Sequence, residues 1–149
     1  MAHLSTARAT HAKYATALTL AFAAALAMPT PARADFADDR AAIMGPQNQC
    51  DAANETQDRV SMAAYCSLAA QKIAAFTIGG LKTEAWATLR TIEAHDLMVA
   101  ADGISRTDLE LAEDQYRAAL TIMNEVVALH PNAYRIELRG SIRKVVSLF

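Results

Sequence analysis

The chain has 149 residues, a formal net charge of −2 and a hydrophobic content of 53%. This length fits a single domain, and so many apolar residues are enough to build its core. The slight acidic excess argues against a protein that binds nucleic acid nonspecifically, because phosphate contacts need clustered Lys and Arg.

Residues 1–34 have the pattern of a cleaved bacterial export signal. This stretch holds three basic residues and none of the 16 acidic ones, and its middle is an apolar run too short to span a bilayer comfortably. Ala32 and Ala34 give the small-x-small pattern that a signal peptidase recognises. We expect cleavage after Ala34 and a soluble mature protein, periplasmic or secreted, with 11 basic residues, 16 acidic residues and a net charge of −5.

The segment 35–54 is polar and is interrupted by Gly45-Pro46, so we expect it to be mostly loop. The first long helix is predicted over residues 55–76, with Asn54 as its N-cap and Gly79-Gly80 after its end. Its apolar stripe comprises Met62, Tyr65, Cys66, Ala69, Ile73 and Phe76.

A second helix is predicted over residues 84–101. Thr83 is the expected N-cap, and Asp102-Gly103 has the composition of a turn after the helix. The expected apolar face comprises Ala85, Leu89, Ile92 and Val99, with Trp86 beside it.

A third helix is predicted from Thr107 to His130. Thr107 and Glu110 have the spacing of a capping box, and Pro131 disfavours helix in the residue before it. The inward residues are expected to be Leu109, Ala112, Tyr116, Ala119, Met123 and Val126.

Residues 134–149 fit two patterns, an alternating strand and an amphipathic helix. Helix is favoured because the preceding segments are helical and a lone hairpin has no sheet to join. The fold class is therefore all-α. We expect a small antiparallel bundle of three long helices plus a C-terminal helix, with residues 55–149 as the helical domain.

Cys50 and Cys66 are the only cysteines. An even number in an exported chain favours a disulfide, although free thiols, an intermolecular bridge and a redox pair remain alternatives. The bridge is barely within reach if the helix starts at Glu55, and is easier if the helix starts near Asp58. Either the predicted Asn54 cap or the predicted disulfide must therefore be wrong.

No sequence motif for catalysis, metal binding or a cofactor is apparent, so the chain leans away from an enzyme. His95 and His130 are the histidines after the signal, and we interpret them as a surface side chain and a residue favoured by a helix C-terminus. Neither has a second histidine at the spacing of a metal site.

The candidate partner contacts are Trp86, which flanks its apolar stripe, and a basic row of Arg135, Arg139 and Arg143 with Lys144. Core packing for the tryptophan and a solvated helix face for the row are the plainer interpretations. The sequence favours a protein that binds another exported protein, as an accessory factor, chaperone-like protein, inhibitor or immunity-type partner. The alternative is a periplasmic module that binds a small molecule or a metal.

Overall fold

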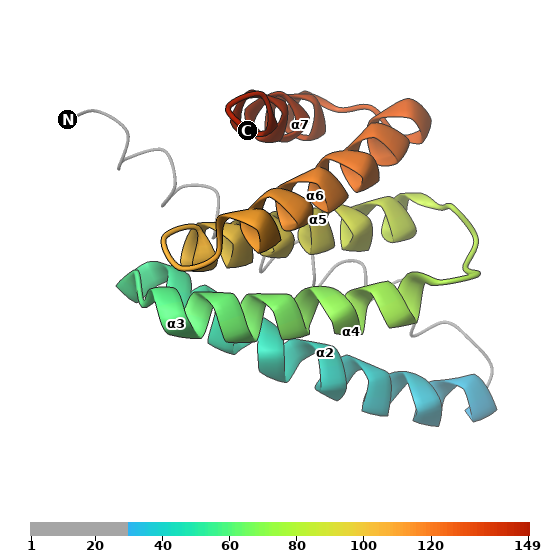
Figure 1. The fold of residues 1–149 in the computed structure, drawn as a ribbon. Helices are drawn as coiled ribbons and strands as arrows, with labels where there is room; N and C mark the ends of the chain where they lie inside the picture. Colours follow the sequence, from blue (N-terminus) through green and yellow to red (C-terminus); the bar gives the residue numbers. More distant parts are fainter. Residues whose placement is uncertain (1–29) are drawn as a thin grey trace.

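The computed structural model describes the backbone of residues 30–149 and the side chains of residues 40–149 (Figure 1). This part of the chain is helical and contains no strand, as the all-α prediction requires. Its elements are α2 (Thr30–Thr56), α3 (Arg59–Ser61), the π-helical η1 (Met62–Cys66), α4 (Ser67–Thr77), α5 (Glu84–Ile104), α6 (Leu109–Leu129) and α7 (Ala133–Val146). None of these helices is long and apolar enough to cross a membrane.

The predicted export signal lies mostly in residues 1–29, outside the described residues. The predicted cleavage residues, Ala32 and Ala34, belong to the first turns of α2, and their side chains are also outside the described set.

Helices that follow one another in the chain pack side by side. α2 contacts η1 and α4, α4 packs on α5, α5 on α6, and α6 on α7. Figure 1 shows this as a stack from α2 at the bottom to α7 at the top, with α5 behind α6. α5 is the central helix, since it contacts α3, η1, α4, α6 and α7.

The polar segment 35–54, expected to be mostly loop, is part of the continuous helix α2. Gly45-Pro46 lies inside this helix, although an interior proline removes one backbone hydrogen bond and costs about 3 kcal/mol. The compensation comes from tertiary packing along one side of α2. The buried residues on that side are Ile43, Gln47, Cys50 and Ala53.

The turn after α2 corrects the predicted start of the next helix. Gln57 adopts a left-handed backbone with φ of 56°, and the Asp58 side chain then caps α3 by accepting from the Ser61 amide. The predicted cap, Asn54, lies within α2. With the second helical segment starting at Arg59, Cys66 comes within reach of Cys50, which resolves the conflict between cap and disulfide.

α5 begins where the sequence predicted, with the Thr83 hydroxyl accepting from the Trp86 amide. It continues through Asp102-Gly103 to Ile104, so the predicted turn at that pair is wrong. Gly103 lies within the helix where the α3 and η1 backbone approaches so closely that no room is left for a Cβ.

α6 is capped by Asp108, which accepts from the Leu111 amide, and not by the predicted Thr107. It ends at Leu129, one residue before the predicted end at His130, and Pro131 follows the cap. Residues 133–146 form the helix α7, capped by Asn132, so helix was the correct alternative for most of the C-terminal segment.

Most of the predicted apolar stripes are buried, with two clear exceptions. Tyr65 is 37% exposed because η1 is a π turn, which adds a residue to that turn and changes the side each position faces. Leu109, the first residue of α6, is 60% exposed. The buried members are Met62, Cys66, Ala69, Ile73, Leu89, Ile92, Val99, Ala112, Tyr116, Ala119, Met123 and Val126.

Candidate functional site

Cys50 of α2 and Cys66 of η1 are joined by a disulfide, and both are buried. Their Cα atoms are 4.6 Å apart, and the bridge closes the α2–η1 hairpin across the turn at Gln57. The bond therefore fixes the C-terminal part of α2 against the helix that follows it.

A buried polar cluster lies beside the disulfide, where α2 meets α5. We call Asp96, Gln47, Asp51 and His95 the Asp96 cluster. Gln47 Nε2 donates to Asp96 Oδ1 at 3.1 Å and to Asp51 Oδ1 at 3.2 Å. His95 Nδ1 lies 3.8 Å from Asp96 Oδ1. Cys50 Sγ lies 3.7 Å from the same oxygen, a contact only, since a disulfide sulfur has no proton to donate.

Asp96 has no accessible surface, and its second oxygen, Oδ2, has no hydrogen-bond partner. Gln47 Oε1 is also buried and without a partner. Burial raises the pKa of Asp96 above its ordinary value, although the contacts with His95 and Gln47 act in the opposite direction. Burial therefore makes protonation of Asp96 more favourable than protonation of an exposed aspartate.

Glu93 is a second buried acid on α5, one helical turn before Asp96. Burial raises the pKa of Glu93 to about 6, and the neighbouring Arg90 guanidinium, which donates to its Oε2, offsets part of that rise. The burial of these two acids was not predicted, because the spacing of residues 93, 95 and 96 on one helix does not indicate which of them another helix covers.

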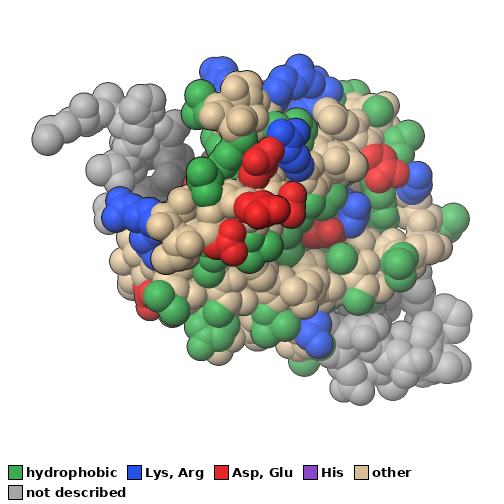
Figure 2. Space-filling model, viewed as in Figure 1, with side chains coloured by type: hydrophobic (Ala, Val, Ile, Leu, Met, Phe, Trp, Pro, Cys, Tyr) green, Lys and Arg blue, Asp and Glu red, His purple; other side chains and the backbone are tan. Residues whose placement is uncertain are grey.

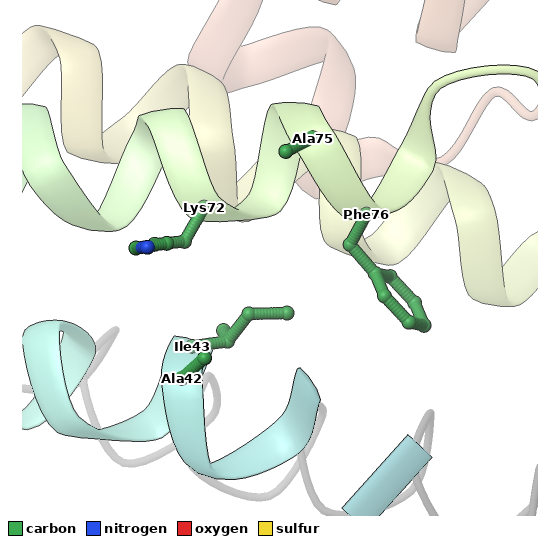
Figure 3. Close-up of a pocket in the computed structure, with 5 residues that line it drawn as sticks. All are labelled: Ala42, Ile43, Lys72, Ala75 and Phe76. Atoms are coloured by element: carbon green, nitrogen blue, oxygen red, sulfur yellow. The ribbon is translucent and has the colours of Figure 1, made fainter. Parts of the chain in front are cut away.

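A groove of about 390 Å³ opens between α2 and α4 (Figure 3). Its lining residues are Ala42 and Ile43 from α2 and Lys72, Ala75 and Phe76 from α4. Among these described lining residues Lys72 is charged and exposed, and the other four are apolar. The sequence did not predict this groove, because one of its walls is α2 and the segment around residue 45 was expected to be loop.

The exposed face of α4 leads to this groove. Tyr65, Leu68, Lys72 and Ala75 follow one another at steps of three and four residues, and all are exposed. Tyr65 and Leu68 expose 37% and 39% of their surface. We call these four residues the α4 stripe.

Trp86, a predicted partner contact, is only 8% exposed and packs in the core beside Ile122, Met123 and Ile142. The Lys82 ammonium lies 5.9 Å from the centre of its ring. The plainer interpretation of Trp86 as a core residue therefore fits the structure.

Arg135, predicted to begin a basic row on α7, is buried as well. Its guanidinium pairs with Glu84 Oε1 at 2.6 Å and donates to the His130 carbonyl at 2.9 Å. This pairing lowers the pKa of Glu84. Arg143 is exposed and Arg139 half-buried, so the row does not form one continuous positive face.

His130 faces an acceptor with each ring nitrogen: Nε2 lies 2.7 Å from the Lys82 carbonyl oxygen and Nδ1 lies 3.1 Å from Glu84 Oε2. His95 is largely buried in the Asp96 cluster, and is not the surface side chain we expected. Within residues 40–149 no three His, Cys, Asp or Glu side chains lie together as a metal site.

Acidic side chains gather over α6 in the space-filling view (Figure 2). Glu110 and Asp114 are exposed, and Glu113 is paired with Arg117 one turn later. These groups form a solvated helix face.

No protein-family model matches this chain, and comparisons with curated proteins and with solved structures also find no match. The function must therefore be inferred from the residues themselves.

Proposed function

We propose that this chain is an exported protein, a small antiparallel helical bundle once residues 1–34 are removed, that acts by binding another exported protein. Its docking site is the groove between α2 and α4 together with the α4 stripe. The disulfide between Cys50 and Cys66 supports export, because such bonds persist in oxidising compartments and are rare in the cytosol.

The observation that carries the proposal is the run of exposed side chains from the groove along α4 to Tyr65 of η1, apolar apart from Lys72. Ala75 and Phe76 line the groove, and Leu68 and Tyr65 extend the same helix face beyond it. A contiguous exposed apolar surface is a mark of protein association, whereas scattered apolar residues need no explanation. An amphipathic helix laid along α4 would bury this surface.

Photo-cross-linking in the native host tests the proposal. A photoreactive residue at Leu68 or at Ala75 should capture the same protein, because both positions lie on one face. The same residue at Asn124, exposed on α6, is the control and should not capture it.

The captured protein should then bind a leucine variant less tightly. Leu68→Ser should weaken binding about tenfold or more, since a buried leucine contributes roughly 1.5–3 kcal/mol. Leu129→Ser is the matched control, because Leu129 is 48% exposed but lies on α6. Equal weakening by both variants, or capture at Asn124 alone, would contradict the proposed docking site.

A further inference from the structure

Asp96 joins α5 to α2 at a point where the hydrogen bonding is incomplete. Its Oδ1 accepts from Gln47 of α2, while its Oδ2 and Gln47 Oε1 are buried acceptors without partners. A proton on the carboxyl group turns one of these acceptors into a donor. The carboxylate, in contrast, leaves a full charge in a region that water does not reach.

Burial disfavours the ionised form of Asp96, whereas the charges around it act in both directions, with His95 lowering its pKa more than Asp51 raises it. From α2 it faces the carboxyl of Asp51, which is repulsive. From α5 it faces His95, at 3.8 Å, and Glu93, whose charge is paired with Arg90. From η1 the neighbouring group is the uncharged disulfide. Within the described residues, His95 is thus the basic group in contact with Asp96, at the outer limit of an ion pair.

α2 can respond to this charge over only part of its length. Cys50 is bonded covalently to η1, so the helix is fixed from that residue onward. Before Cys50 the attachment includes Gln47, the half-buried Met44, and Ile43, which packs with Ile73, Leu89 and Ile92. Pro46, lying between them, has no amide proton, so one helical hydrogen bond is missing there.

We propose that protonation at Asp96 controls the docking of α2, with the segment 40–49 closing on α5 when the carboxyl is neutral and loosening when it is ionised. The disulfide keeps the loosened segment tethered at Cys50. One wall of the groove belongs to this segment, so the shape of the groove also depends on the protonation of Asp96. Only the use of this change to control partner binding rests on the proposed function.

The direction with pH follows from linkage. Burial raises the pKa of Asp96 in the closed state, and water returns it to its ordinary value of 3.8 when α2 lifts. The closed state is therefore fully favoured below 3.8 and loses that advantage as the pH rises to the closed-state pKa. Within this window the open population grows about tenfold per pH unit.

Hydrogen exchange of the oxidised full chain between about pH 4 and 8 tests the proposal. After correction for intrinsic exchange rates, protection of the amides at 41–49 should fall about tenfold per pH unit within the window. Amides of α6 provide the internal reference, because global unfolding would affect both regions. Asp96→Asn, which is neutral and of the same shape, should remove the α2-specific fall.

Asp51→Asn is the matched control, since it removes a carboxyl of the same cluster that touches Gln47 and is partly exposed. It should keep the fall. If Asp96→Asn does not fold, carbon-13 titration of the Asp96 carboxyl in the wild-type chain gives the same answer. Protection at 41–49 that is independent of pH, an unchanged fall in Asp96→Asn, or an Asp96 that titrates near 3.8 overturns the proposal. None of these readouts involves a partner protein.

Discussion

Gly103 is where α5 comes closest to the backbone of the α2–α4 hairpin. A Cβ at this position would lie 2.6 Å from the Arg59 carbonyl oxygen and 2.7 Å from the Ala63 amide nitrogen. Both are backbone atoms, so α5 must move away from α3 and η1 to relieve the overlap. We predict that Gly103→Ala lowers the free energy of unfolding by about 1–3 kcal/mol, measured by urea denaturation.

Gly140 of α7 is the matched control for this substitution. It also lies inside a helix, but a Cβ there meets nothing within 4 Å. Gly140→Ala should raise the free energy of unfolding by roughly 0.5–1 kcal/mol, because alanine loses less backbone entropy in a helix. Similar effects of the two substitutions would contradict the close contact at Gly103.

Arg135 is a second residue whose contribution to stability depends on its burial. It is 4% exposed and holds Glu84 and the His130 carbonyl, joining the start of α5 to the start of α7. We predict that Arg135→Gln costs about 2 kcal/mol of unfolding free energy, since hydrogen bonds of a charged donor are lost. Arg143→Gln, on the exposed side of the same helix, should change it by less than about 0.5 kcal/mol. Equal costs would exclude a special role for Arg135.

At the scale of the elements, the sequence correctly predicted those helix ends that are determined by neighbouring residues. Thr83 caps α5, and Pro131 follows the end of α6, because caps and prolines act on the backbone next to them. α2 was missed because tertiary contacts override Gly45-Pro46. Its buried side, Ile43, Gln47 and Cys50, does repeat at helical spacing, but a glutamine in that series does not look like core.

The candidate site was predictable only in its covalent part. Two cysteines in an exported chain favour a disulfide on composition alone. Asp96 is buried where Gln47 and Cys50 of α2 meet α5, and Trp86 packs with residues of α6 and α7. Such burial depends on how helices far apart in the sequence pack together. The spacing of residues within one helix carries no information about that packing.

Removal of the disulfide should destabilise α2 more than the other helices. We predict that Cys50→Ala with Cys66→Ala lowers the free energy of unfolding by about 3 kcal/mol, because the bridge closes a short loop in the unfolded chain. Hydrogen exchange should show protection lost in α2 before α6, since α2 is otherwise held mainly by Ile43, Gln47 and Ala53. Equal loss along all helices would show that α2 is not a separate unit.

For the whole molecule, the ionisable groups divide by the direction of their pKa shifts. Burial raises the pKa of Glu93 and of Asp96, which favours the folded state at low pH. Ser61 and Arg135 lower the pKa of Asp58 and Glu84, whose contributions are lost only as the pH falls below the ordinary values of 3.8 and 4.5 respectively. Asp58 and Glu84 are exposed, so solvent screens their contribution, and the buried pair decides the trend.

We therefore predict that the chain is more stable at about pH 4.5 than at about pH 7.5. Glu93 alone, with its pKa raised from 4.5 to about 6, accounts for about 2 kcal/mol of this difference. Urea denaturation at the two pH values measures it. Glu93→Gln should reduce the difference by that amount and leave the part due to Asp96, whereas a stability that rises steadily towards neutral pH would mean that neither acid is buried in the folded chain.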